Sequence, residues 1–425
     1  MRVRSLWGMM ALLPLTGSAV ELLDGNLAIH GFGSVAATRT TSSHVGYRQF
    51  FQPKVQPGDW AFNTDSLLAL QMDVRPHEDL SGTVQVVATT DHTGRFSPRV
   101  EWAFVKYDLT PELRLSAGRL LSPTFMQSEY RFARYAFATT RVSQQLYAVY
   151  PLSKHNGLSA RWARQLAGGS LGIELWGGRE SFDVAGDENG LARSYNSDKL
   201  AGAVISWENP AWLLRGSYSS ARNVTLGGNG YAALEALPPA LRAAAALGCN
   251  GCSKEADAFE RSRRTGATYN VATIGARGRF GEWTLTSELA ANETNAIFGE
   301  MVASQLTLER RFNDWVPYLS VGTLRIHGNE RGTLNLVGPA ALQGAIARTN
   351  TILDGNDTSR NAYAAGVRWD VMPSVALKAE VEHLSFKSDR YCNGTSPLTS
   401  SANCLGDAPR DKRFNLLTLS ADFVF

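Results

Sequence analysis

The sequence predicts an all-β protein, a transmembrane antiparallel β-barrel of sixteen strands. Three observations predict this fold class: runs of about ten residues with alternating polarity, connections that alternate between short and long, and aromatic residues beside the short connections. Of the 425 residues, 44% are hydrophobic and 19% are charged, and the mean hydropathy is -0.18. No segment of the body reaches the roughly 18 apolar residues of a membrane-spanning helix, which excludes a helical membrane bundle.

Residues 1–19 differ from the rest of the chain. Arg2 and Arg4 precede an apolar run, and the small residues Gly17 and Ala19 follow it. This pattern is typical of a secretory signal peptide that is cleaved after Ala19. We therefore expect residues 20–425 to form the barrel.

Alternating polarity identifies the strands. Residues 66–75, 283–290 and 416–425 each place apolar side chains on one face and mostly polar or small ones on the other. Successive strand residues point to opposite faces, so one face suits lipid and the other suits water. We expect strands near residues 27–40, 60–76, 80–91, 98–109, 113–119, 157–166, 170–178, 198–208, 211–221, 266–277, 283–292, 299–312, 315–326, 360–371, 375–387 and 413–425.

The connections between these strands alternate in length. Short turns are expected at residues 76–79, 109–112, 167–169, 208–210, 278–282, 312–314 and 371–373, with longer loops between them. An even-stranded barrel with both termini on one side requires this arrangement, whereas a soluble β-sandwich does not.

Aromatic residues cluster beside the short turns. A girdle at a membrane interface explains this placement better than the core of a sandwich does, because an amphipathic ring is most stable between acyl chains and headgroups. The expected girdle residues are Trp207, Trp212, Phe280, Trp283, Phe312, Trp315 and Trp369.

The four cysteines form two near pairs, Cys249 with Cys252 and Cys392 with Cys404. Export favours disulfides in both pairs. A redox or metal motif is the alternative for Cys249 and Cys252, but no histidine follows and the chain has no second CxxC.

The third loop, residues 120–157, is rich in basic and aromatic residues. Its cations include Arg131, Arg134 and Arg141, and Glu129 is its only carboxylate. Folded inward, the loop would narrow a pore and attract anions; a loop that caps outward and exposes its arginines to solvent is the alternative. By alternation, the charged side chains that face water include Arg114, Arg161, Arg215, Lys378, Asp73, Glu174, Glu288, Glu309, Glu380 and Glu382.

The fifth loop, residues 222–264, contains an Ala- and Leu-rich segment at 231–247 that Pro238 and Pro239 interrupt. We expect two short helices here, with the Cys249–Cys252 bridge ending the second. The basic residues at 261, 263 and 264 suit the steering of anionic solutes or the binding of lipopolysaccharide phosphates, and a solvated charge run without a ligand is the alternative.

The chain resembles the trimeric sixteen-stranded porins of Gram-negative outer membranes. The shared features are the signal peptide, the strand count, the sequence AGR at 117–119 and the terminal Phe425 in LSADFVF. The resemblance implies export through the periplasm to the outer membrane, a homotrimer, and recognition of Phe425 by the barrel assembly machinery. It also implies a third loop that faces arginines of the barrel wall, among them Arg119. Because Arg119 falls on the same face of its strand as the apolar Leu115, a bulge must turn its side chain inward.

The predicted function is a porin, a water-filled channel for passive diffusion of small hydrophilic solutes and ions, with a preference for anions. The alternative is a closed barrel that acts as a surface receptor or adhesin through its long loops. No HExxH or GxSxG motif points to an enzyme, and no metal or cofactor is implied. The net charge of +3 gives no reason to expect a nucleic-acid partner, whereas outer-membrane lipid and lipopolysaccharide are expected partners.

Overall fold

The computed structural model describes most of the chain. The described residues are 20–22, 26–48, 54–55, 57–91, 94–150, 152–184, 193–227, 232–261, 265–296, 299–327, 342–344, 346, 358–387, 402–404 and 412–425.

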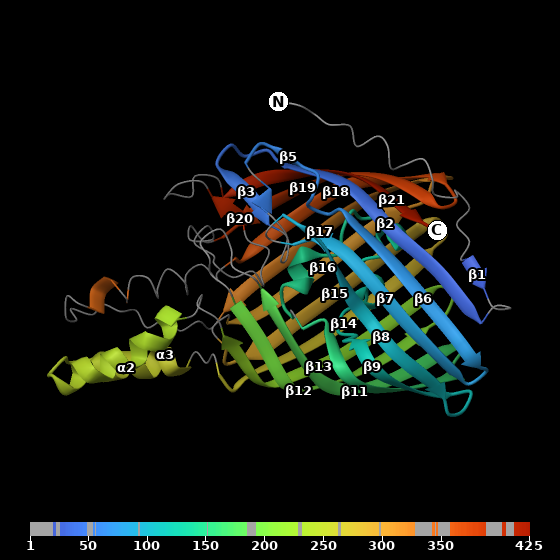
Figure 1. Ribbon diagram of the computed structural model, residues 1–425. Coiled ribbons are helices and arrows are strands. Elements are labelled where there is room, and N and C mark those ends of the chain that lie inside the picture. The colour runs from blue at the N-terminus through green and yellow to red at the C-terminus, as the bar shows by residue number, and fades with distance from the viewer. Residues whose placement is uncertain are drawn as a thin grey trace.

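Sixteen long strands in the described residues form one closed antiparallel barrel (Figure 1). The first of them, β2, pairs with both β6 and the last strand β21, which closes the ring. The strands are β2 (Leu27–Thr40), β6 (Leu67–His77), β7 (Leu80–Thr90), β8 (Phe96–Asp108), β9 (Leu113–Leu121), β10 (Lys154–Leu166), β11 (Gly169–Val184), β12 (Arg193–Glu208), β13 (Trp212–Gly227), β14 (Ala267–Phe280), β15 (Trp283–Thr294), β16 (Glu300–Arg310), β17 (Trp315–His327), β18 (Arg360–Met372), β19 (Val375–Phe386) and β21 (Arg413–Val424).

The predicted strands and turns are confirmed, with two local differences. Strands β11, β12 and β13 each have 16 residues and extend beyond their predicted ends. A register shift between Gly178 and Glu180 interrupts the alternation that the prediction followed. The expected strand at 60–76 is divided, because the short strand β5 (Trp60–Ala61) is separated from β6 by residues 62–66.

The seven short connections lie at one end of the barrel, which we call the turn end, and the other connections lie at the loop end. Two of the latter, residues 91–95 and 295–299, are also short. A separate sheet of β3 (Val45–Arg48), β4 (Lys54–Val55) and β20 (Ala402–Cys404) buries Val45, Tyr47 and Val55 against apolar side chains of β18, β19 and β21 at the loop end. The three-residue strand β1 (Val20–Leu22) pairs with β2 near the turn end.

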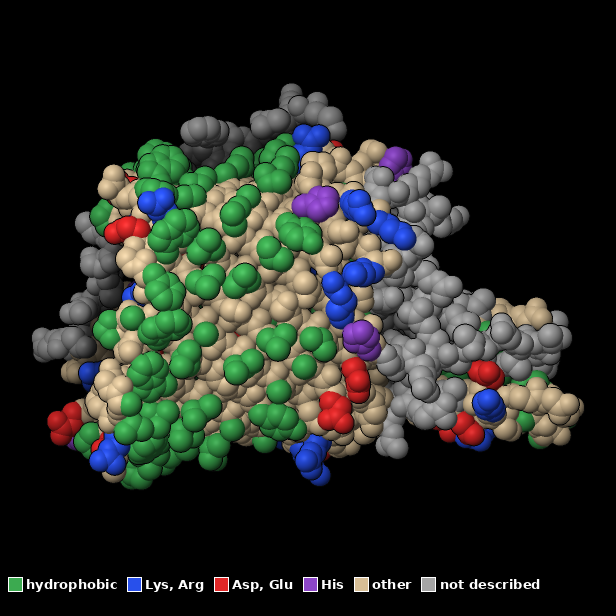
Figure 2. Space-filling model, turned by 180° about the vertical axis from the view of Figure 1, so that it is seen from behind, with side chains coloured by type: hydrophobic (Ala, Val, Ile, Leu, Met, Phe, Trp, Pro, Cys, Tyr) green, Lys and Arg blue, Asp and Glu red, His purple; other side chains and the backbone are tan. Residues whose placement is uncertain are grey.

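The outer face of the barrel carries a belt of exposed apolar side chains (Figure 2). Ile274 and Leu158 are each 65% exposed and Leu319 is 62% exposed. In water, a contiguous apolar surface of this extent would be unfavourable, whereas it matches the hydrocarbon region of a membrane. No helix among the described residues is long and apolar enough to span a membrane.

The predicted aromatic residues lie on this outer face beside the turns. Trp315 stacks on Trp369 with ring centroids 4.9 Å apart, and Trp212 meets Phe280 edge-on at 5.2 Å. The guanidinium of Arg310 lies 4.1 Å from the Phe312 ring centroid. Rings with one polar neighbour and one apolar side fit the boundary between hydrocarbon and headgroups.

The fifth loop forms a helical hairpin beyond the loop end (Figure 1). The predicted break is wrong, because α2 (Ala232–Ala246) continues through Pro238 and Pro239. Leu237 and Leu241, on either side of the prolines, are buried, and this packing offsets the lost backbone hydrogen bonds. The second helix is α3 (Cys252–Arg261), and the confirmed Cys249–Cys252 disulfide joins the two helices. The Cys392–Cys404 pairing stays a prediction, since Cys392 lies outside the described residues.

The belt makes a prediction about Ile274, which lies near the middle of β14. Ile274→Arg should lower the free energy of unfolding in phospholipid vesicles by about 2–4 kcal/mol, because a charge then enters hydrocarbon. Ile274→Leu is the control and should cost less than about 1.5 kcal/mol. Denaturant titration measures both, and equal stability of the Arg variant and the parent would show that this face does not contact hydrocarbon.

Candidate functional site: the lumen and loop three

Loop three (residues 122–153, of which 151 lies outside the described part) is inside the barrel (Figure 1). It contains two short 3-10 helices, η1 (Ser128–Tyr130) and η2 (Arg134–Ala136), and the single helical turn α1 (Gln144–Tyr147). The Ser143 side chain caps α1 by accepting from the backbone N–H of Leu146. Apolar side chains of the loop, including Phe125, Leu146 and Tyr147, are buried in one cluster with residues of the barrel wall. The predicted inward folding is therefore seen, and the outward-capping alternative is not.

The first half of the loop is held by hydrogen bonds to β13, β14 and β15. The backbone carbonyl of Thr124 accepts from the Ser217 hydroxyl at 2.6 Å and the Thr273 hydroxyl at 3.0 Å. The backbone N–H of Met126 donates to the Glu288 carboxylate at 2.8 Å. These bonds satisfy backbone groups that would otherwise be buried without partners.

Arg141 joins the second half of the loop to the opposite wall. Its guanidinium forms a two-pronged pair with the carboxylate of Asp65, at 2.9 and 3.3 Å. It also lies 3.4 Å from Glu380 and 3.3 Å from Glu382, and it donates to the Thr418 hydroxyl at 2.5 Å. Arg141 is only 6% exposed. Its charge is thus neutralised by partners within the barrel.

Asp65 holds a second loop arginine as well. The Arg134 guanidinium lies 3.2 Å from the Asp65 carboxylate, and it also donates to the Asp65 backbone carbonyl at 2.5 Å. Burial by itself would raise the pKa of the Asp65 carboxyl, but Arg141 and Arg134 outweigh burial and hold the pKa below its usual value. Asp65 therefore remains ionised as the shared anchor of two arginines.

Two cations of the wall bind backbone carbonyls of loop three. The Lys378 ammonium donates to the carbonyls of Arg134 at 2.6 Å and Thr139 at 2.9 Å, and it forms an ion pair with Asp422 at 2.8 Å. Arg368 donates to the carbonyl of Phe137 at 3.3 Å. Lys378, which the sequence predicts to line the lumen, thus contacts loop three and serves as an anchor for it.

A third group of charges fixes the part of the loop near β8. Arg131 and Lys154 share the carboxylate of Glu101, at 2.6 and 2.8 Å. Glu101 is 1% exposed, which makes these pairs a buried anchor as well. Glu129 faces the lumen and lies 3.4 Å from Arg215 on β13.

The remaining predicted site residues lie apart from loop three. Arg119 lies on β9, opposite Ala103 of β8 and Asn156 of β10, and β9 pairs with both strands without a register shift. No bulge therefore turns Arg119 inward. Its guanidinium contacts Glu180 at 3.3 Å. Arg161 lies in register between Arg114 and Glu174, and its place on the wall of the lumen stays a prediction.

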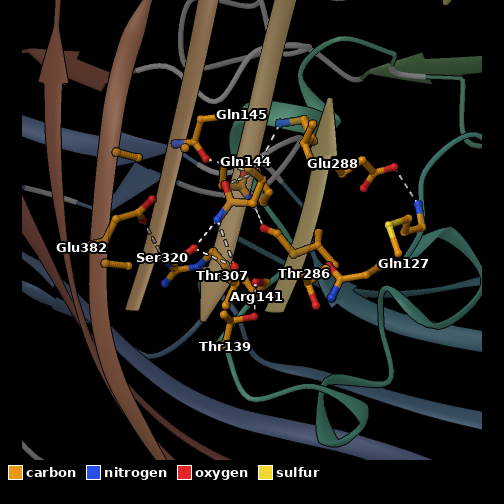
Figure 3. Close-up of a pocket in the computed structure, with 18 of the residues that line it drawn as sticks. Gln127, Thr139, Arg141, Gln144, Gln145, Thr286, Glu288, Thr307, Ser320 and Glu382 are labelled. Atoms are coloured by element: carbon orange, nitrogen blue, oxygen red, sulfur yellow. Dashed lines mark hydrogen bonds and ion pairs between the residues drawn. The ribbon is translucent and has the colours of Figure 1, made fainter. Parts of the chain in front are cut away.

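Two cavities lie between loop three and the wall formed by β14 to β19. The first, about 70 Å³, has Thr139, Arg141, Gln144 and Gln145 of the loop on one side (Figure 3). The wall opposite contributes polar side chains, which are Thr286, Glu288, Gln305, Thr307, Glu309, Ser320, Glu380 and Glu382.

The second cavity, about 400 Å³, lies nearer the turn end. It shares Met126, Gln127, Thr286 and Glu309 with the first, so the two cavities adjoin each other, and we refer to them together as the path beside the loop. Its lining also includes Arg277 and Arg279 of β14, and neither forms an ion pair within the described part of the chain.

Sequence reasoning missed two residues that organise this site, Asp65 and Glu101. Asp65 was placed inside an expected strand, although the polar run Asn63–Ser66 is typical of a turn and Asp65 has a positive φ of 68°. Glu101 occupies the register shift between β7 and β8, which no alternation pattern reveals. Within the described residues, no group of three or more His, Cys, Asp or Glu side chains could hold a metal ion.

Comparison with known proteins identifies the fold. No model of a known protein family matches the chain, and no curated protein matches its sequence. The structure is similar to OmpF of Salmonella typhi in complex with daunomycin, with a TM-score of 0.55, 12% identity, and coverage of 96% of this chain and 100% of that chain. An anion-selective porin from Comamonas acidovorans matches with a TM-score of 0.52, 10% identity, and coverage of 94% and 100%. The predicted sixteen-stranded porin fold is thereby confirmed.

The shared anchor predicts a specific effect of Asp65→Asn. Loss of its charge leaves Arg134 and Arg141 buried with too little negative charge, which should cost about 3–5 kcal/mol of unfolding free energy and expose loop three to trypsin. Glu129→Gln is the matched control: it removes a pair whose carboxylate is 45% exposed, and it should cost less than about 1 kcal/mol. Denaturant titration and peptide mapping measure both effects. An Asn variant as stable and as protease-resistant as the parent would contradict the anchor.

Proposed function

We propose that this chain is an outer-membrane porin of a Gram-negative bacterium, through which small hydrophilic solutes and ions diffuse passively. The observation that carries the proposal is the pair of adjoining polar cavities beside a loop that ion pairs hold inside a closed barrel. The apolar belt and the aromatic girdle support a membrane location. A loop fixed inside the lumen sets the width and the local field of such a path.

We place the predicted anion preference on Arg277 and Arg279. An arginine attracts a passing anion only if its charge is not already neutralised. Arg134 and Arg141 are nearly buried and paired with carboxylates, so they contribute less to the field of the path. Arg277 and Arg279 line the path without an ion pair among the described residues, while Glu282 and Glu309 of the same cavity limit the preference.

Single-channel recording in a planar bilayer tests the pore itself. Refolded mature protein should give steady conductance steps on the nanosiemens scale, because a polar path through a wide barrel conducts hydrated ions. A correctly folded barrel that gives no steps would contradict the proposal.

The reversal potential under a salt gradient tests the source of selectivity. Arg277→Gln combined with Arg279→Gln should lower the anion-to-cation permeability ratio by roughly two- to fivefold, since two unneutralised cations leave the path. Arg164→Gln, which removes an exposed cation from the outward-facing side of β10, is the control and should leave the ratio unchanged. If the double variant keeps the parent's ratio, the selectivity does not come from these arginines.

A surface receptor or adhesin is the second candidate function. The feature that favours it is the disulfide-linked hairpin of α2 and α3, which extends beyond the loop end (Figure 1). A silent barrel in the conductance experiment would favour this candidate, and removal of residues 232–261 should then abolish binding of the external partner without unfolding the barrel.

Three further assignments stay predictions. They are the cleavage of the signal peptide, the homotrimer, and recognition of the C-terminus by the assembly machinery. Phe425 itself exchanges backbone hydrogen bonds with Gly31 of β2, at 2.7 and 2.9 Å. An aromatic terminus that completes the pairing of the last strand with the first is consistent with its proposed role as an assembly signal.

A further inference from the structure

A third cavity, of about 160 Å³, lies between residues 128–133 of loop three and the wall formed by β2, β6, β7 and β8. We call it the loop-three pocket. The path beside the loop follows another part of the wall, from β14 to β19. Tyr130 lines both the pocket and the turn-end cavity of the path, so the two spaces meet at this ring. The proposed channel makes no use of the pocket.

The floor of the pocket is a row of polar side chains that the strand register places next to one another. His30 of β2 lies opposite Gln71 of β6, and Gln71 lies opposite Gln85 of β7. Gln85 in turn lies opposite Trp102 of β8. The Gln85 amide donates to the Gln71 side chain at 2.7 Å, which fixes the orientation of both amides. Four neighbouring strands thus contribute one side chain each to a defined surface.

Aromatic rings form the sides of the pocket. Phe32 of β2 and Trp102 of β8 come from the wall, and Tyr130 and Phe132 come from the loop. The Arg131 guanidinium lies 4.5 Å from the Phe132 ring centroid, which places a cation beside this aromatic lining. An apolar cavity of about 150 Å³ is large enough for one benzene-sized ring. The pocket therefore suits a ligand with a single planar ring.

Two buried N–H groups of the lining form no hydrogen bond within the described residues. They are Nε1 of Trp102 and Nε of Arg131. A buried donor without a partner is unfavourable, because it has lost its bonds to water. A ligand with acceptor oxygens beside Trp102 and Arg131 would supply the partners that both groups lack.

The charge beside Arg131 is positive. Glu101 is the carboxylate of this part of the lining, and it pairs with Arg131 at 2.6 Å and with Lys154 at 2.8 Å. Arg99, two residues earlier on β8, also interacts electrostatically with Glu101. One carboxylate among three cations leaves a surplus of two positive charges, which favours an anionic ligand over a neutral one.

The pocket opens to the lumen beside Glu129 and His30, whose side chains are 45% and 36% exposed. Glu129 lies 3.4 Å from Arg215, so its negative charge is already offset. An anion in the lumen therefore meets no uncompensated carboxylate of the lining at this opening.

We propose that the loop-three pocket binds a small aromatic carboxylate, with its ring against Phe32 and Trp102 and its carboxylate beside Arg131. The carboxylate oxygens accept from the Arg131 guanidinium and from Nε1 of Trp102. The ring of the ligand covers the aromatic lining. An aliphatic carboxylate leaves that lining uncovered, and a neutral ring leaves the surplus positive charge uncompensated. The site does not depend on conduction through the path.

Titration of 4-fluorobenzoate into the refolded mature protein in detergent micelles, followed by fluorine NMR, tests the pocket. Trp102→Phe should weaken binding by about three- to tenfold, because it removes a hydrogen-bond donor and part of the ring contact. Trp162→Phe is the matched control and should leave the affinity unchanged. Trp162 lies on β10 opposite Ile173, whose side chain is exposed on the outer face.

A second variant tests the charge. Arg131→Gln should weaken binding by about tenfold or more, because hydrogen bonds to a charged donor are the stronger ones. Arg131 also anchors loop three, so its loss can loosen the pocket as well. Trp102→Phe leaves the ion pairs of the loop in place and is therefore the decisive variant.

Four outcomes would overturn the proposal. They are absence of 4-fluorobenzoate binding to the parent, unchanged affinity in Trp102→Phe, equal weakening in Trp102→Phe and Trp162→Phe, and binding of acetate or benzyl alcohol as tight as that of 4-fluorobenzoate. Single-channel conductance of the parent without ligand reports on the path, whereas fluorine NMR reports on the pocket. Failure of the proposed channel is therefore distinguishable from failure of the proposed site.

Discussion

Closure of the sheet between β2 and β21 is the constraint on which the rest of the structure depends. In hydrocarbon, every backbone N–H and C=O must find a partner within the protein, so a strand with an open edge is not tolerated. Two glycines of β2 allow this closure. A Cβ atom at Gly31 would lie 2.5 Å from the ring of Phe425, and one at Gly33 would collide with Phe423. The rings at the C-terminus thus lie directly against the glycines of the first long strand.

A closed ring of this size would leave a wide lumen, and loop three fills much of it. Burial of a long loop requires partners for its backbone and its charges, and the wall supplies them. Asp65 comes from the connection before β6, and Glu380 and Lys378 come from β19, yet all three contact residues 134–141. Arg134 and Arg141, which the sequence suggests as determinants of ion selectivity, mainly hold loop three against the barrel wall. The path beside the loop is lined both by such paired residues, Arg141 with Glu380 and Glu382, and by Arg277 and Arg279, which have no ion pair among the described residues.

The sequence was informative where physics imposes a regular pattern. Strands that separate lipid from water must alternate, so their positions and turns could be predicted within a few residues, as could the girdle and the Cys249–Cys252 bridge. The sequence was less informative where contacts between distant segments determine the local structure. Arg141 is visible as a charge in the sequence, but its partner Asp65 is 76 residues away. Likewise, α2 passes through two prolines because α3 packs against it, which local propensity does not reveal.

The placement of the cations follows from the cost of burial. A buried guanidinium needs a carboxylate, because its desolvation is not otherwise compensated, and Arg131, Arg134 and Arg141 each have one. Cations that line the path carry no such requirement, so Arg277 and Arg279 can remain without an ion pair within the described residues. The same residue type therefore has two roles inside one barrel. Arginines paired with carboxylates fix the loop, and arginines without such a pair set the field of the path beside it.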